Sequence, residues 1–363
     1  MGWIGKLVST IFISLALVQS VASAIVPDSY IVKYTQTPVK DFSPALNVED
    51  YYPHIDAYSI KANSKSFFSL LQNDNIEYIE PNKRVYLFHE TQLNVPSWGL
   101  ARLSQEELVT QDYTYPSTAG AGETIYILDT GLLDSHPEFG GRANQIYTAP
   151  GVGENIDCNG HGTHVGGTIG GEVTGVAKKS TLLGVKVLAC NGSGTTASVL
   201  NGIEFILNQP GNITKIINMS LGGGRSRAID DLVANSKNAL FVVAAGNSNT
   251  DACTGSPSGS PGALTVAASD IRDQKAPFSS YGACVDIVAP GVDITGPYIP
   301  EGFRALSGTS MAAPHVAGIA ALVQSQTPTQ DAATLKQIII SLGLREKLSG
   351  LDIITPNILS HIS

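Results

Sequence analysis

"ETIYILD", residues 123–129, is a nearly continuous apolar run that ends in an acidic residue. Four later runs share this texture and are bounded by polar residues or glycine: 181–188, 215–220, 239–245 and 263–269. Such runs are typical of parallel strands in a sheet that is covered on both faces. Helical patterns alternate with them at 194–209, 226–238 and 309–326. This alternation predicts an α/β domain with a mostly parallel sheet.

The segment 25–90, ahead of this domain, has a different texture. Two strand-like runs, "PDSYIVKY" and "IEYIEPNKRVYLF", flank the helical pattern "SKSFFSLLQND", and the segment contains no cysteine. The pattern predicts a small α+β unit. A polar connector, "HETQLNVPS", then leads into the α/β domain.

The first 24 residues have the layout of a secretory signal peptide. Lys6 precedes the apolar run "LVSTIFISLALVQSVASA", which ends in the small residues Ala22-Ser23-Ala24. Cleavage is expected after Ala24. The alternative is a membrane anchor, which is disfavoured because polar residues interrupt the run and its most apolar part is short for a span. We therefore expect an exported, soluble protein.

The charge balance limits the partners of the chain. It carries 22 basic and 31 acidic residues, for a net charge of −9. Nucleic acids and anionic membranes bind basic patches, so neither is expected as a main partner.

The four cysteines are disulfide candidates because the chain is expected to be exported. They are Cys158, Cys190, Cys253 and Cys284. Four cysteines allow three pairings, and the nearest-neighbour pairing closes two loops of about 30 residues, each stabilising by roughly 3–4 kcal/mol in the chain-entropy model. The alternative is that one or more thiols stay buried and free.

A proline near the start of the last predicted helix places Ser310 at a helix N-terminus. Proline has no N–H to donate and is tolerated chiefly in the first turn, so Pro314 predicts that the helix begins close to Ser310. Unpaired N–H groups and the positive end of the helix dipole meet there. Ser310 could cap this helix, or it could be a nucleophile whose reaction develops an oxyanion.

Three further polar residues follow strand ends or open a helix. Asp129 ends the run 123–129, His161 lies in "DCNGHGTHVGGTIGG" (157–171), and Asn247 follows Gly246 in "VVAAGNSN". The carboxyl ends of parallel strands are where ligand sites form. Asp129 could merely cap a turn, and the Asn247 amide could close a turn or donate to a developing negative oxygen.

His161 and His164 lie three residues apart, which is a spacing that could pair two metal ligands. No HExxH motif or obvious third ligand accompanies them, and His164 is predicted to be structural.

Together these segments supply the parts of a catalyst for acyl transfer. An imidazole takes the proton of a serine, a carboxylate fixes the tautomer of that imidazole, and amide donors stabilise the oxyanion. The chain order Asp…His…Ser is the order of subtilisin.

The sequence resembles the subtilisin-like serine proteases, most closely the proteinase K-like branch. The matching stretches are "YILDTGLLDSHPEFGGR", "NGHGTHVGGTIGG", "SLGGG", "AAGN" and "GTSMAAPHVAG", and the resemblance covers roughly residues 92–363. It implies a three-layer α/β fold, a triad of Asp129, His161 and Ser310, and an oxyanion hole formed by Asn247 and the Ser310 N–H.

The same resemblance implies a domain plan and a substrate groove. Residues 25–90 become an inhibitor-type propeptide, removed by cleavage between Phe88 and Asn94, and residues 91–363 the peptidase domain. The groove edges are Gly192, Ser193 and Gly194 on one side and Ser220, Leu221 and Gly222 on the other, between which a peptide adds as a strand. Ala244, Ala245 and Gly246 would form one wall of a roomy, uncharged pocket, which implies a broad, mainly hydrophobic preference.

Three further features rest on resemblance or on a sequon. Pro261, Ala263 and Asp286 match positions that bind a structural calcium ion in relatives, and hard cations accept such oxygens. The pairing Cys158–Cys190 and Cys253–Cys284 matches some bacterial members. Among the sequons at Asn191, Asn212 and Asn218, the best glycosylation candidate is Asn212, in a loop, since Asn191 borders the groove and Asn218 lies on a predicted buried strand.

The sequence therefore predicts a secreted, autoprocessed serine endopeptidase that acts on proteins and peptides. It is expected to be a monomer inhibited by its own propeptide, with no cofactor for catalysis, and extracellular or alternatively vacuolar. An α/β-hydrolase esterase is excluded because no GxSxG elbow is present and the residue order is wrong. A peptide-binding homologue without activity is disfavoured because all four chemical positions are intact.

Overall fold

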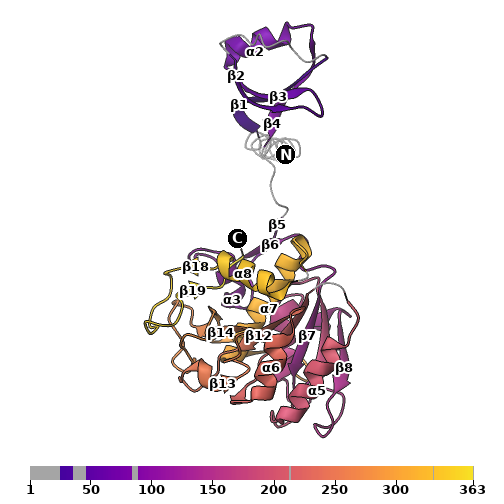
Figure 1. Cartoon of the computed structure of the whole chain (residues 1–363), viewed down its shortest axis with the longest axis vertical. Coiled ribbons are helices and arrows are strands. Elements are labelled where there is room, and N and C mark those ends of the chain that lie inside the picture. The colour runs from indigo at the N-terminus through magenta and orange to yellow at the C-terminus, as the bar shows by residue number, and fades with distance from the viewer. Residues whose placement is uncertain (1–24, 36–45, 84–88, 212–213, 330, 363) are drawn as a thin grey trace, which may run out of the picture. The chain divides into compact units, whose positions relative to one another are not determined.

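A computed structural model describes residues 25–35, 46–83, 89–211, 214–329 and 331–362 (Figure 1). It divides into two compact units, Met1–Leu87 and Phe88–Ser363. The signal peptide predicted for residues 1–24 and the glycosylation predicted at Asn212 lie outside the described residues. Within the described part of the chain, no helix is both long and apolar enough to cross a membrane.

The smaller unit is an antiparallel sheet with one helix. The strand order is β2-β3-β1-β4, and the elements are β1 (Ile25–Tyr34), β2 (Asn47–Tyr52), β3 (Ala57–Lys61), α2 (Ser64–Leu71) and β4 (Ile76–Lys83). Val32, Ile60 and Leu70 pack in its core. The Asn63 side chain caps α2 by accepting from two backbone N–H groups of the first turn. This arrangement confirms the α+β fold expected for this segment.

The larger unit is built on one long sheet. Its order among the described residues is β18-β19-β15-β14-β12-β10-β7-β9-β8, and every neighbouring pair from β19 to β8 is parallel. The strands are β7 (Thr124–Asp129), β8 (Ala143–Thr148), β9 (Thr181–Lys186), β10 (Lys215–Met219), β12 (Ala239–Ala244), β14 (Ala263–Ser269), β15 (Ile287–Pro290), β18 (Leu344–Arg345) and β19 (Ile358–Leu359). The prediction of a mostly parallel sheet is confirmed.

Helices cover both faces of this sheet (Figure 1). The core on one face holds α4 (His161–Gly170), α7 (Thr309–Gln326) and α8 (Ala332–Leu342), and the core on the other holds α5 (Thr196–Leu207) and α6 (Arg227–Asn235). Along β7, Ile125 and Ile127 belong to the first core, whereas Tyr126 and Leu128 belong to the second. Burial on both faces explains why the strands read as continuous apolar runs.

Short elements complete the larger unit. They are β5 (His89–Gln92), α3 (Trp98–Leu103), β6 (Tyr113–Pro116), η1 (Pro137–Phe139), β11 (Gly223–Gly224), η2 (Ala252–Thr254), β13 (Gly255–Ser256), β16 (Ile294–Pro297) and β17 (Phe303–Leu306).

One glycine allows α4 to reach its neighbour closely. A Cβ atom placed on Gly167 would lie 2.0 Å from the Pro297 Cδ atom of β16, which is far inside van der Waals contact. A Cβ atom on Gly224 would meet nothing within 4 Å. Because α4 begins at His161, this close packing also sets the position of that residue.

We expect Gly167→Ala to lower the free energy of unfolding by about 1–3 kcal/mol, since the added methyl group must displace packed atoms. Gly224→Ala is the matched control, and its effect should stay within about 0.5 kcal/mol. Urea unfolding followed by tryptophan fluorescence measures both. Equal losses for the two variants would contradict the close approach.

Candidate active site

Asp129 lies at the carboxyl end of β7, with its side chain completely buried. Its Oδ1 atom accepts a hydrogen bond from the Thr130 N–H at 2.7 Å and lies 2.7 Å from His161 Nδ1. A buried carboxylate without such donors would be costly. Two of the predicted catalytic residues are thus in direct contact.

His161 is the first residue of α4, and a glycine lets this helix approach Asp129. A Cβ atom on Gly162 would lie 2.0 Å from the Gly131 carbonyl oxygen, so only glycine fits there. The Gly162 N–H donates to Thr130 Oγ1 at 3.0 Å. The His161 side chain keeps 27% exposure, which leaves its ring accessible from the neighbouring cavity.

The surrounding charges make His161 a stronger base. Burial lowers the pKa of His161, but the charge and hydrogen bond of Asp129, together with the charge of Asp157, outweigh burial and raise it above its ordinary value.

Asp157 connects the end of β7 to the start of α4. Its Oδ1 atom accepts from Thr130 Oγ1 and from the N–H groups of Asn159 and Gly160, and its Oδ2 atom accepts from the N–H and hydroxyl of Thr163. Asp157 was not among the residues predicted from the sequence. A usable signal existed, because Asp157 precedes a helix whose N-cap, Gly160, has no capping side chain.

Ser310 is the second residue of α7, so the helix begins close to Ser310 as predicted, but Pro314 lies inside the helix and not in its first turn. Since Pro314 has no N–H, the Ser310 carbonyl lacks its usual helical donor, and the Ser220 hydroxyl donates to it instead at 2.9 Å. The Ser310 hydroxyl donates to the Ser220 carbonyl at 3.1 Å. Among the described residues this hydroxyl therefore bonds to Ser220 and not to His161.

Asn247 follows β12 and is oriented by α7. Its Oδ1 atom accepts from the Thr309 N–H at 2.8 Å and from the Thr309 hydroxyl at 2.9 Å. The backbone N–H can only donate, so the carbonyl side of the amide must face Thr309. The NH₂ group of Asn247 is thereby left for the cavity that Ser310 also lines.

Two adjoining cavities contain all of the predicted groove residues. The first, about 520 Å³, is lined by His161 together with Gly192, Ser193, Gly194, Ser220, Leu221 and Gly222. The second, about 360 Å³, is lined by Ser310 and Asn247 together with Ala244, Ala245 and Gly246. The segment Leu221–Gly224 borders both cavities, so His161 and Ser310 open onto neighbouring parts of one surface depression.

Comparisons with known proteins identify the family of this chain. The sequence model of the peptidase S8 family, described as the subtilase family, matches residues 120–344. The "Subtilisin-like serine protease AsES" of Sarocladium strictum is 39% identical over 353 residues, which are 92% of this chain and 89% of that protein. The chain belongs to the subtilase family.

Two further relatives support the same assignment. "Subtilisin-like protease 7" of Arthroderma otae is 48% identical over 259 residues, covering 69% of this chain and 64% of that protein. The crystal structure of a cold adapted subtilisin-like serine proteinase matches with a TM-score of 0.69 and 40% identity, over 74% of this chain and 98% of that chain. The predicted subtilisin-like fold is confirmed, and this subtilase is a serine endopeptidase.

The second cavity of the subtilase contains an acidic residue that was not predicted from the sequence. Asp251 lines it, although the pocket was expected to be uncharged. The Asp251 Oδ1 atom accepts from the Cys253 N–H at 2.9 Å and caps η2. The sequence does hold a signal for this residue, because Asp251 lies two positions before Cys253, where an acidic side chain can cap a helical turn.

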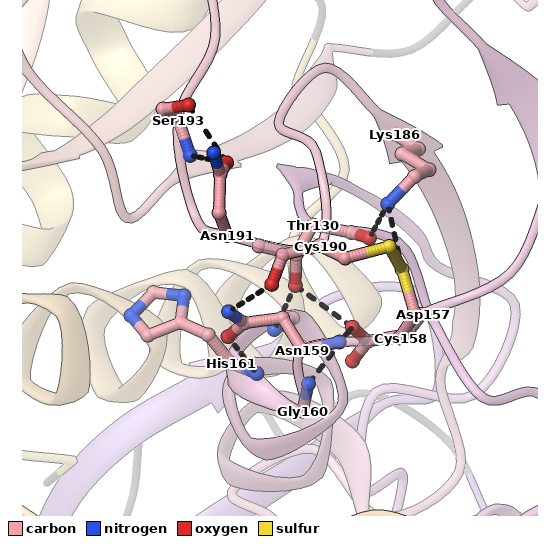
Figure 2. The surroundings of a disulfide bond; sticks show 11 residues. Thr130, Asp157, Cys158, Asn159, Gly160, His161, Lys186, Cys190, Asn191 and Ser193 are labelled. Atoms are coloured by element: carbon pink, nitrogen blue, oxygen red, sulfur yellow. Dashed lines mark hydrogen bonds between the residues drawn. A yellow bond between two sulfur atoms is a disulfide. The ribbon is translucent and has the colours of Figure 1, made fainter. Parts of the chain in front are cut away.

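The subtilase has both disulfides of the nearest-neighbour pairing, with Cα–Cα distances of 5.0 Å for Cys158–Cys190 and 5.2 Å for Cys253–Cys284. Figure 2 shows the first one beside His161. Asn159 lies across this disulfide: its Nδ2 atom donates to the Cys190 carbonyl at 2.8 Å and its Oδ1 atom accepts from the His161 N–H at 3.2 Å. The groove edge is therefore fixed to the start of α4.

A fully buried lysine lies on the other side of this disulfide (Figure 2). The Lys186 ammonium donates to the Thr130 carbonyl and lies 3.8 Å from the Cys158 sulfur. Burial lowers the pKa of Lys186, against the opposing charges of Asp157 and Asp129. One buried cation thus accompanies the two buried carboxylates of the site.

His164 is structural in the subtilase, as expected. Its Nε2 atom lies 3.0 Å from the carbonyl oxygens of both Ile294 and Arg304. Burial lowers the pKa of His164 to about 4, so the ring is neutral. Within the described ranges, no group of three or more His, Cys, Asp or Glu side chains could hold a metal ion.

Two of the residues expected to bind calcium contact a lysine instead. Lys336 Nζ donates to the Ala263 carbonyl and lies 2.9 Å from Asp286 Oδ2. An ammonium group on these oxygens leaves no place for a second cation, so the residues present do not fit a calcium ion.

The two disulfides close loops of nearly equal length, with sequence separations of 32 and 31 residues. Replacing either pair by alanine should therefore lower the free energy of unfolding by similar amounts, roughly 3–4 kcal/mol each. Urea unfolding, with an irreversible serine-protease inhibitor bound in every sample, measures the two losses. A loss near zero for one pair would show that its loop is already constrained in the unfolded chain.

Proposed function

We propose that this subtilase is an exported endopeptidase whose triad is Asp129, His161 and Ser310. The observation that carries the proposal is the 2.7 Å contact between His161 Nδ1 and the buried Asp129 carboxylate, beside a depression onto which Ser310 opens. Asp129 holds the imidazole in the tautomer whose Nε2 atom can accept a proton. No cofactor is needed for these steps.

The catalytic cycle starts by moving the Ser310 hydroxyl. It leaves the Ser220 carbonyl, turns toward His161 Nε2 and gives its proton to that nitrogen as Oγ attacks the scissile carbonyl carbon. The tetrahedral intermediate collapses, the C–N bond breaks, and the leaving amine takes the proton from His161. Water, activated by the same imidazole, then hydrolyses the acyl-enzyme.

The oxyanion of the intermediate is stabilised by two donors, the Asn247 NH₂ group and the Ser310 N–H. The contacts of Thr309 with Asn247 Oδ1 support this role, because they orient the amide before substrate arrives. The N-terminus of α7 adds its positive dipole end at the same place.

The substrate is an extended peptide that adds as a strand between Gly192–Gly194 and Ser220–Gly222. Its side chain before the scissile bond enters the second cavity, whose small apolar wall of Ala244 and Ala245 supports a broad, mainly hydrophobic preference. Asp251 adds one carboxylate to this cavity, which makes basic side chains acceptable as well.

The enzyme is made as a zymogen with three parts: a signal peptide (1–24), an inhibitor-type propeptide (25–90) and the peptidase domain (91–363). The separate compact unit before Leu87 supports this plan. The maturation site lies between Phe88 and Asn94, and β5 has to detach from β6 before this segment can enter the groove. The mature enzyme is a secreted monomer with a glycan at Asn212.

Replacing the nucleophile tests the triad and the self-processing together. Ser310→Ala should lower kcat on casein by about 10⁶-fold, the loss known for the serine of subtilisin. The secreted variant should also keep the size of the unprocessed chain on a gel. Ser325→Ala, on the same helix, is the control and should match the wild type in both respects.

Two results would contradict parts of the proposal. A processed Ser310→Ala chain would assign maturation to another protease. Unchanged casein cleavage by this variant would remove Ser310 from the triad.

The pH dependence tests the environment of His161. Only the neutral imidazole accepts a proton, so kcat/KM should rise with pH and reach half of its plateau above 6.5, the ordinary pKa of histidine. Asp157→Asn removes one charge that raises this pKa and should move the midpoint to lower pH. Glu154→Gln, which removes an exposed acid from the same loop, should leave the midpoint unchanged. An unmoved midpoint in Asp157→Asn would show that Asp129 alone sets it.

A further inference from the structure

A small cluster of oxygens lies at the amino ends of two adjacent strands. Ala263 is the first residue of β14, and Asp286 directly precedes β15. Asp286 and Thr265 are joined twice, since the Thr265 N–H donates to Asp286 Oδ2 and the Asp286 N–H donates to the Thr265 carbonyl, each at 2.9 Å. Because the strands are parallel, the amino ends of β14 and β15 lie on the side of the sheet opposite to the carboxyl end of β7, which carries Asp129.

The ammonium group of Lys336 lies within this cluster. Lys336 belongs to α8, and its Nζ atom donates to the Ala263 carbonyl and lies 2.9 Å from Asp286 Oδ2. The lysine side chain is 17% exposed and the aspartate side chain 22%, so solvent screens this ion pair only in part. One lysine thus connects α8 to the ends of two strands.

Calcium would need oxygens that Lys336 already occupies. Ca²⁺ takes six to eight oxygen ligands at about 2.3–2.6 Å. To bind here it would have to expel the Lys336 side chain, because a divalent ion and an ammonium group cannot share the same two oxygens without strong repulsion. A single carboxylate, that of Asp286, gives little charge to compensate such an exchange.

We propose that Lys336 is a built-in replacement for a metal ion. Its ammonium supplies the positive charge that Ala263 and Asp286 hold, so the folded enzyme needs no calcium at this position. The exchange has a physical advantage: a covalently attached cation cannot be removed by dilution or by chelators.

The same contact supports one wall of the second cavity. Four residues of the segment ahead of β14 line that cavity: Ala252, Thr254, Gly255 and Ser258. The Thr265 hydroxyl of β14 donates to the Ser258 carbonyl at 2.9 Å. The Cys253–Cys284 disulfide joins this segment to the residues before Asp286. Lys336 therefore holds α8 against the start of β14, which is connected to the residues that line the second cavity.

The test compares the response of the melting temperature to calcium, in millimolar calcium chloride against EGTA. All chains carry Ser310→Ala so that self-digestion cannot distort the unfolding transition. In EGTA, Lys336→Met should melt roughly 2–6 °C below its parent, because Asp286 loses its partner. Calcium should then raise the melting temperature of Lys336→Met by more than that of the parent, since the vacated oxygens become available to the ion.

Two further chains make the comparison specific. Lys237→Met removes one charge from an exposed site near the start of α8, and its calcium response should equal that of the parent. Lys336→Met combined with Asp286→Asn should lose the additional calcium response. If calcium raises the melting temperature of Lys336→Met no more than that of the parent, the lysine does not replace a metal ion and the proposal fails. Unfolding needs no proteolysis, so this outcome is independent of the proposed function.

Discussion

The hydrogen bond between Asp129 and His161 requires a carboxylate in the protein interior. Much of the surrounding structure compensates the cost of burying this charge. Burial of an unpaired carboxylate is costly, and Asp129 is completely buried. The Thr130 N–H and the His161 ring contact its Oδ1 atom, and the ammonium of Lys186 adds a positive charge nearby. Gly162 is required for the same reason, because any side chain there would push α4, and His161 with it, away from the strand end.

A lysine supports the sheet at each end of its parallel strands. At the carboxyl edge, Lys186 is buried beside two carboxylates that serve the active site. At the amino edge, Lys336 holds the single carboxylate of Asp286, far from any proton transfer. In both places the ammonium group balances the charge of a carboxylate and also donates to a backbone carbonyl. Each lysine therefore fixes the position of the backbone as well as the local electrostatic potential.

The sequence predicted the elements whose signals are local. Strands buried on both faces read as apolar runs, and the predicted start of α7 close to Ser310 agrees with Thr309, although Pro314 lies inside the helix. The edge strand β8 was not predicted, because it is mostly half-buried and lacks such a run. Lys336 was missed for another reason. Its role depends on a partner distant in sequence, since Lys336 and Ala263 are 73 residues apart, and no local pattern encodes such a contact.

Pro314 also links the nucleophile to the substrate groove. By removing one N–H from α7 it frees the Ser310 carbonyl, which Ser220 then binds, while the Ser310 hydroxyl returns a bond to the Ser220 carbonyl. Ser220 begins the groove edge along which a peptide would pair. In the proposed mechanism, a peptide that pairs along this edge competes with the Ser310 hydroxyl for the Ser220 carbonyl. The proposal thus links release of the Ser310 hydroxyl toward His161 to occupation of the groove.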